Sequence, residues 1–213
     1  MTVTQYNGFW IATDVYLNQD QRDYNAELVA VDLLALHWTR EAIAGILGNM
    51  DVESTMNPAL IEGRNVHTLI DNNTCLQINN STGVGLVQWT GHTSTPPVGQ
   101  KLASFAIRYN QEWYDGKLQT FRLQREYEED LQFDHGTVDG VSWDWQSYVV
   151  STEEPEQLAK VWQYLYERGG IDTNKRQERA RYYYNRIGRI DNPWLLYFLN
   201  KNQKGVRRRC IAL

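Results

Sequence analysis

Apolar side chains recur every three to four residues over most of the chain, which is the spacing of one face of an α-helix. Residues 25–37 predict a first helix with this pattern. After a short turn, Thr39 is a candidate N-cap for a second helix over residues 40–52. Weaker helical patterns follow at residues 98–114, 118–133, 155–167 and 177–187.

The middle of the chain follows a different pattern. Residues 56–82 are a long polar loop, and in residues 83–89 side chains alternate with period two, which favours a short extended piece or a hairpin. The sequence therefore predicts a mainly α (α+β) fold, a helical domain with one small β-hairpin. We expect an N-terminal arm over residues 1–25, one domain over residues 26–190, and a C-terminal tail over residues 191–213.

The charge distribution argues against a nucleic-acid-binding protein. The formal net charge is −5, although the last thirteen residues hold five Lys and Arg and no acidic side chain, so the remainder is more acidic still. Affinity for DNA or RNA depends on a basic footprint along the phosphates, which this body lacks. The basic end follows an apolar stretch at residues 194–199, and we expect it to dock on an acidic partner, with a solvated terminus as the alternative.

Cysteine and histidine usage points away from metal chemistry. The four histidines are scattered, and Cys75 and Cys210 lie far apart, so we expect two free thiols, no metal and no cofactor. No basic and apolar leader opens the chain, and no apolar run reaches about 18 residues. We therefore expect neither a secretion signal nor a membrane span.

The second predicted helix carries the candidate for chemistry. Ile46, Leu47 and Met50 lie on its apolar stripe, and Glu53 falls at the edge of that stripe. A carboxylic acid backed by apolar side chains keeps its proton near neutral pH, as protonation of a glycosidic oxygen requires. Pro58 ends the helical conformation nearby, which places Glu53 at a helix-to-loop junction. Taken alone, a glutamate at a helix end is more often a cap or an ion-pair partner.

Two segments together resemble a known family. Residues 42–58, which include Glu53-Ser-Thr-Met-Asn-Pro58, and residues 83–89, Gly-Val-Gly-Leu-Val-Gln-Trp, are similar to motifs of bacteriophage tail lysozymes. That family is related to goose-type lysozymes and soluble lytic transglycosylases. A third match is Leu165-Tyr-Glu-Arg168. The resemblance covers about residues 26–187 and implies a lysozyme-like fold with the hairpin beside the active-site cleft.

The family motifs also imply roles for individual residues. Glu53 takes the place of the catalytic acid, and Trp89 is the ring we expect to stack on a sugar. Substrate binding is implied for Ser54, Gly85, Leu86, Gln88, Trp89 and Tyr166. For Tyr166, packing in the core is an equal alternative. For Glu167 we expect a structural ion pair with Arg168 or Arg179.

A hydrolase of this kind normally has a second carboxylate. Glu62 and Asp71, in the loop between the two motifs, are the candidates. A lytic transglycosylase needs no such group, because the 6-hydroxyl of the sugar itself attacks. The closer similarity to tail lysozymes favours a muramidase that cleaves the β-1,4 bond between N-acetylmuramic acid and N-acetylglucosamine. A lytic transglycosylase and an inactive structural tail protein are the alternatives.

The resemblance implies a place of action in the virion tail. A cell-wall enzyme made in the host cytoplasm without a secretion signal meets its substrate only if it is released or carried out by a virion. We expect the enzyme to open the host cell wall during genome entry. Its expected partners are the glycan strands of peptidoglycan and other phage tail proteins, the latter bound through residues 1–25 and 191–213.

Overall fold

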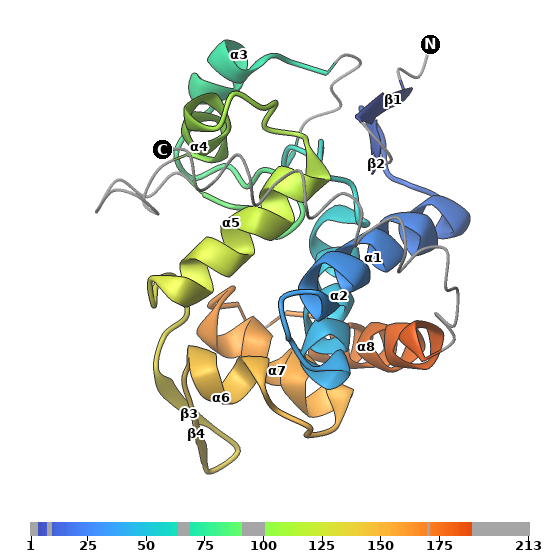
Figure 1. Cartoon of the computed structure of the whole chain (residues 1–213), viewed down its shortest axis with the longest axis vertical. Coiled ribbons are helices and arrows are strands. Elements are labelled where there is room, and N and C mark those ends of the chain that lie inside the picture. Colours follow the sequence, from blue (N-terminus) through green and yellow to red (C-terminus); the bar gives the residue numbers. More distant parts are fainter. Residues whose placement is uncertain (1–3, 8–9, 64–68, 91–100, 170, 189–213) are drawn as a thin grey trace.

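The computed structural model describes residues 4–7, 10–63, 69–90, 101–169 and 171–188 (Figure 1). This part of the chain forms eight helices and two antiparallel hairpins, which confirms the mainly helical α+β fold. The elements in chain order are β1 (Thr4–Asn7), β2 (Trp10–Thr13), α1 (Gln19–Leu34), α2 (Arg40–Ser54), α3 (Asn72–Leu76), α4 (Leu102–Arg108), α5 (Gly116–Glu128), β3 (Gly136–Val138), β4 (Val141–Trp143), α6 (Trp145–Val149), α7 (Pro155–Leu165) and α8 (Thr173–Ile187).

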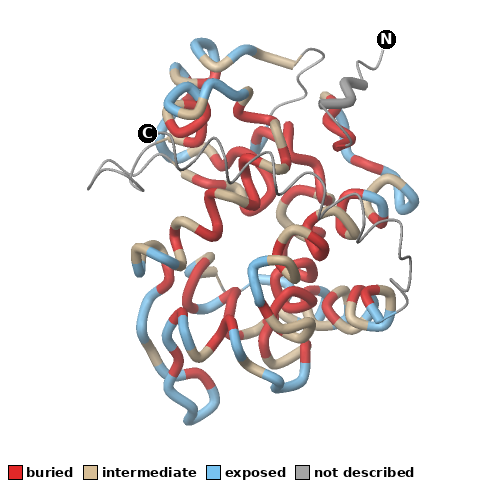
Figure 2. The backbone as a smooth tube through the Cα atoms, in the orientation of Figure 1, coloured by how far each residue is buried: buried red, intermediate tan, exposed pale blue. Residues whose placement is uncertain are grey.

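Helix α2 is the centre of the molecule. It packs against α1, α7 and α8, and every residue from Ala42 to Asp51 is buried (Figures 1 and 2). The predicted cap is confirmed, since the Thr39 side chain accepts a hydrogen bond from the backbone N–H of Ala42 at 3.3 Å. The helix ends at Ser54, because Thr55 adopts a left-handed conformation with φ of 53°. Both ends of α2 are therefore fixed by local chemistry.

Two glycines let neighbouring helices approach α2 closely. A Cβ atom at Gly48 would lie 2.4 Å from the carbonyl oxygen of Arg176 on α8. At Gly45 it would lie 2.9 Å from the carbonyl carbon of Leu158 on α7. The opposing atoms belong to backbone and cannot move aside alone, so only glycine fits at these positions. The side of α2 that carries the two glycines is thus covered by α7 and α8.

Helix α1 begins earlier than predicted. Asn18 caps it, and the side chains of Asn18 and Gln21 exchange hydrogen bonds with each other's backbone N–H groups. The first turn is polar and lacks an apolar period, which is why the sequence pattern missed it. Upstream, Trp10 is only 4% exposed and belongs to the main core. The described part of the predicted N-terminal arm therefore packs on the domain.

Residues 83–89 form a tight turn rather than two strands. Val84 and Trp89 make a single antiparallel bridge. Gly85 and Gln88 both have positive φ, 80° and 50°, and this reverses the chain after one bridge. The described hairpins lie elsewhere, as β1–β2 and as β3–β4, and the latter lies between the helical patterns predicted at residues 118–133 and 155–167.

Several predictions concern regions outside the described residues. The C-terminal tail, 191–213, and Cys210 within it both fall there, whereas Cys75 is buried in α3. Among the residues that are described, no helix is long and apolar enough to cross a membrane. In the same residues, no three His, Cys, Asp or Glu side chains are grouped to hold a metal ion.

Candidate active site

Glu53 lies on the last turn of α2, beside the start of α8. Its carboxylate accepts a hydrogen bond from the guanidinium of Arg176, and the two form an ion pair. The Glu53 side chain is 24% exposed, while that of Arg176 is 8% exposed. Glu53 therefore lies at the rim of the core with one side open to solvent, which is the position the helical pattern predicted.

The guanidinium of Arg176 is held on three sides. Nη1 donates to the amide oxygen of Asn49 at 2.9 Å, and Nε donates to the carbonyl of Ile171 at 3.3 Å. Asn49 is itself fully buried and donates to the carbonyl of Ala159 on α7 at 3.0 Å. Because each of its three nitrogens donates a hydrogen bond, Arg176 presents a fixed positive charge to Glu53.

A second carboxyl group, Glu167, is influenced by the charges of Glu53 and Arg176. It follows α7 and accepts a hydrogen bond from the ring N–H of Trp162 at 3.0 Å. Burial raises the pKa of Glu167 to about 8, and the negative charge of Glu53 acts in the same direction. The hydrogen bond from Trp162 and the charge of Arg176 oppose this rise. The Glu167 carboxyl is therefore easier to protonate than that of a glutamate in water.

The predicted ion pair of Glu167 with Arg168 or Arg179 is wrong. Arg168 pairs with Asp134 at 2.7 Å, and Arg179 pairs with Asp51. The reason is the turn after α7, where Arg168 has a φ of 55° and is exposed while Glu167 bonds to a buried tryptophan. Glu167 and Arg168, although adjacent in the sequence, therefore lie in different environments.

Ser54 joins the end of α2 to the turn at residues 83–89. Its hydroxyl lies 2.8 Å from the carbonyl oxygen of Leu86 and 2.9 Å from that of Met50. The N–H of Leu86 donates to the side chain of Gln119 on α5 at 2.8 Å. Ser54 and Leu86 are fully buried. They hold the turn against the end of α2, next to Glu53.

The glycine and glutamine of this turn maintain its shape. A Cβ atom at Gly85 would lie 2.8 Å from the side-chain oxygen of Gln119, in addition to the strain of its positive φ. The side-chain N–H of Gln88 donates to the carbonyl of Gly85 at 2.7 Å. Gln88 is only partly buried. It is the member of the predicted sugar-binding set on this turn that keeps exposed surface.

Trp89 and Tyr166 are core residues. Trp89 is 4% exposed and Tyr166 is 2% exposed, so the predicted stacking of Trp89 on a sugar is wrong for this structure. The ring N–H of Trp89 donates to Glu126 at 2.9 Å, and the hydroxyl of Tyr166 donates to the same carboxylate at 2.5 Å. Arg122 completes the cluster with an ion pair to Glu126 at 3.0 Å. A buried carboxylate thus takes the polar groups of both rings.

The two predicted second carboxylates have roles in the loop. Glu62 is exposed and accepts a hydrogen bond from the N–H of Gly83 at 3.0 Å. Asp71 caps α3, and hydrogen bonds from Thr74 hold the pKa of this carboxyl below its usual value. Neither carboxylate shares a hydrogen bond or an ion pair with Glu53 among the described residues.

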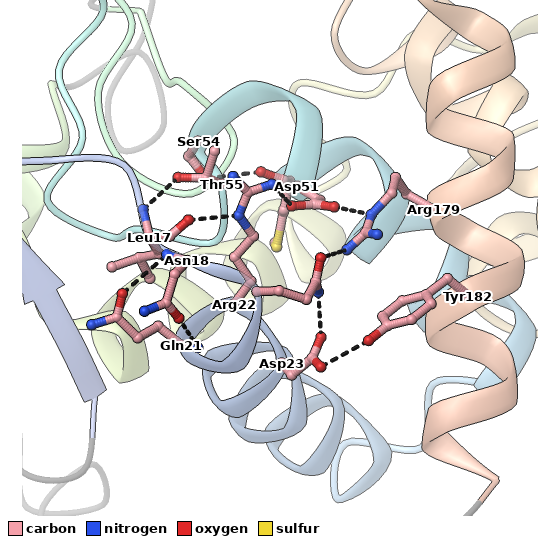
Figure 3. Close-up of polar contacts among 12 residues, drawn as sticks. Leu17, Asn18, Gln21, Arg22, Asp23, Asp51, Ser54, Thr55, Arg179 and Tyr182 are labelled. Carbon is pink, nitrogen blue, oxygen red and sulfur yellow. Dashed lines mark hydrogen bonds and ion pairs between the residues drawn. The ribbon is translucent and has the colours of Figure 1, made fainter.

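A buried aspartate fixes the part of α2 that carries Glu53. The Asp51 side chain is 2% exposed and lies between Arg22 of α1, at 3.0 Å, and Arg179 of α8 (Figure 3). Tyr182 of α8 donates to Asp23 of α1 at 2.8 Å in the same network (Figure 3). These contacts tie α1, α2 and α8 together two residues before the catalytic candidate.

Sequence reasoning missed Asp51 and Arg176, and it named Glu167 only as a structural ion-pair partner. Asp51 had a usable signal, because a carboxylate that follows directly on a buried helical stretch needs a cationic partner. Arg176 had none, since it is one of several cations on a polar helix. The contacts of Asp51 and Arg176 depend on how α8 packs across α2.

Comparison with known proteins agrees with this architecture. A family model described as phage tail lysozyme matches residues 24–187, which include Glu53 and Arg176. The chain is also similar to Morphogenesis protein 1 of Bacillus phage B103, with 38% identity over 80 residues. That match covers 38% of this chain and 19% of the phage B103 protein, so the chain spans only a small part of that relative. With most of its length matched, this phage lysozyme-like chain belongs to the phage tail lysozyme family.

Proposed function

We propose that the protein is a muramidase that cleaves the β-1,4 bond between N-acetylmuramic acid and N-acetylglucosamine, with Glu53 as the general acid. The observation that carries this proposal is the position of Glu53. Its side chain is 24% exposed, lies at the end of a buried helix and is paired with Arg176, in a chain of this family.

The proposed chemistry follows from that position. Glu53 donates its proton to the glycosidic oxygen, the bond from that oxygen to C1 breaks, and the sugar passes through an oxocarbenium-like state. Water then attacks C1 and loses a proton to the solvent, from which Glu53 regains the proton that it gave to the leaving oxygen. The ion pair with Arg176 favours the carboxylate that Glu53 becomes once its proton has left. Arg176 thereby lowers the energy of the state that follows bond cleavage.

A lytic transglycosylase is the second candidate, and one observation favours it. Glu62 and Asp71, the two loop carboxylates considered for a hydrolase, are both occupied by hydrogen bonds to backbone N–H groups. A transglycosylase needs no second carboxylate, because the 6-hydroxyl of the muramic acid attacks C1 and water is not consumed.

Product analysis separates these activities. Purified peptidoglycan is digested with the wild-type protein, and the muropeptides are identified by mass spectrometry. A muramidase yields reducing-end N-acetylmuramic acid. Products carrying only 1,6-anhydro-muramic acid would assign the transglycosylase. Absence of any cleavage by folded protein would assign an inactive structural member of the family.

We also propose that the protein acts from the virion tail during genome entry, anchored through residues 191–213. The family description and the name of the phage B103 relative support a role in the phage particle. Deletion of residues 192–213 should leave cleavage of purified peptidoglycan intact and prevent incorporation into virions. Purified particles that still contain the truncated protein by immunoblot would contradict the anchoring role of this tail.

A further inference from the structure

The side chain of Gln119 connects three separate stretches of backbone. Gln119 lies in the first turn of α5 and is fully buried. Its amide oxygen accepts a hydrogen bond from the N–H of Leu86 at 2.8 Å. Its amide nitrogen donates to the carbonyl oxygens of Pro58 and Trp113, each at 2.8 Å. One acceptor and both donors of this amide are therefore used on main-chain groups.

Two of these three partners belong to the segments that adjoin Glu53. Pro58 lies five residues after Glu53, just beyond the end of α2. Leu86 is the residue whose carbonyl oxygen lies 2.8 Å from the hydroxyl of Ser54, the direct neighbour of Glu53. The same glutamine thus holds the chain after Glu53 and the turn that is bonded to Ser54.

The turn at residues 83–89 approaches α5 through its glycine. The N–H of Gly85 donates to the carbonyl of Leu60 at 2.9 Å, which holds the turn to the chain that leaves α2. A Cβ atom at Gly85 would lie 2.8 Å from the amide oxygen of Gln119. The missing side chain at this position is therefore what lets Gln119 reach the N–H of Leu86.

We propose that Gln119 is the positioning residue that holds the turn at residues 83–89 against the end of α2, and that it thereby fixes the geometry of the site at Glu53. The inference rests on the proposed function for its catalytic meaning. Because Gln119 is fully buried, it acts through Leu86 and Ser54 and not by touching the substrate. Reacting groups need to be held within about 0.5 Å of their productive arrangement, and buried hydrogen bonds behind them supply this precision.

The three bonds require a primary amide at this position. Methionine has a similar length but can bond to none of the three main-chain groups. Without the amide, the N–H of Leu86 and the carbonyls of Pro58 and Trp113 lose a partner while they are buried. The turn then moves to regain hydrogen bonds, and its contact with Ser54 moves with it. Gln119→Met is therefore the test variant.

Gln124→Met is the matched control. Gln124 is a second buried glutamine on α5. It accepts from the ring N–H of Trp38 at 2.8 Å and donates to Glu128 at 3.0 Å. The control makes the same chemical change on the same helix and leaves the bonds to the turn in place.

The first measurement needs no activity. In the ¹⁵N-labelled full chain, NMR follows hydrogen exchange at the N–H of Leu86 relative to the amides of α7, which correct for changes in overall stability. Gln119→Met should raise this relative rate at least about tenfold, while Gln124→Met should leave it within about threefold. Gly85→Ala displaces the oxygen of Gln119 from the other side and should raise it too. An unchanged relative rate in Gln119→Met and Gly85→Ala overturns the proposal, whether or not the protein cleaves peptidoglycan.

The second measurement is the rate of muropeptide release at saturating peptidoglycan and equal folded concentration. Gln119→Met should be about 10- to 100-fold slower than wild type, because displacement of a site by about 1 Å has effects of this size. Gln124→Met should stay within about threefold. Equal losses in the two variants, or no loss in Gln119→Met, overturn the role of Gln119 in the site. A wild type that releases nothing refutes the muramidase proposal instead, and exchange at Leu86 then decides on Gln119 alone.

Discussion

Arg176 in the first turn of α8 forms an ion pair with Glu53 in the last turn of α2. The two residues are far apart in sequence, so their contact depends on the packing of one helix across the other. Asn49 and Gly48 of α2 make that packing possible, the first by binding Arg176 and the second by leaving room for its backbone. Stability and chemistry therefore depend on the same helix pair.

Gly48→Ala should destabilise the protein through this helix pair. The added methyl group would lie 2.4 Å from the carbonyl oxygen of Arg176, so α8 must shift away from α2. Overpacking of this kind costs about 1–3 kcal/mol, or more where backbone must move. Thermal unfolding followed by circular dichroism measures the loss. Gly169→Ala is the control, because nothing lies within 4 Å of a Cβ at that position. Equal melting temperatures for the two variants would show that α2 and α8 are not so tightly packed.

Asp32→Asn should make stability less dependent on pH. Asp32 on α1 accepts a hydrogen bond from Thr120 at 3.1 Å, and burial raises the pKa of this carboxyl to about 6. The folded state therefore binds this proton more tightly than the unfolded state, and the stability it provides is lost as pH rises from about 4 through 6. Above that window the variant should exceed wild type by about 1–3 kcal/mol in chemical denaturation. A difference that does not change between acid and neutral pH would contradict this role of Asp32.

Trp89→Phe should destabilise the core by about 1–3 kcal/mol. It removes the ring N–H that donates to Glu126 at 2.9 Å, and this carboxylate is fully buried. Trp143→Phe is a matched control, because the ring N–H of Trp143 is also buried but has no hydrogen-bond partner in the described structure. Chemical denaturation should give a clearly larger loss for Trp89→Phe. Similar losses for both variants would mean that ring volume, and not the bond to Glu126, matters at Trp89.

The features that the sequence predicted best are those that depend on residues close together in the chain. The cap at Thr39, the central helix after it and the rim position of Glu53 follow from neighbouring residues and a regular apolar period, and the structure has all three. The sequence also predicted the fold class, because helical patterns extend along most of the chain. The turn at residues 83–89 was less predictable, since two positive φ angles decide between a hairpin and a tight turn.

Long-range partners could not be predicted in this way. A tryptophan beside a sugar-binding motif can bury its apolar ring and bond its N–H equally well against a sugar or inside the protein core. For Trp89 the choice depends on Glu126, which lies on a different helix. In the same way, Glu167 accepts from the ring N–H of Trp162 only because the turn after α7 directs its side chain back toward that helix, while Arg168 remains exposed.

The central claim is that the carboxyl group of Glu53 donates the proton that cleaves the glycosidic bond. The most direct test is release of soluble muropeptides from purified peptidoglycan by wild type and by Glu53→Gln at equal folded concentration. Glutamine keeps the shape of the side chain and an oxygen that can accept from Arg176, so the melting temperature should change by only a few degrees, while cleavage should fall by at least about 100-fold. Cleavage by Glu53→Gln at a rate close to that of wild type would contradict the assignment of Glu53 as the general acid.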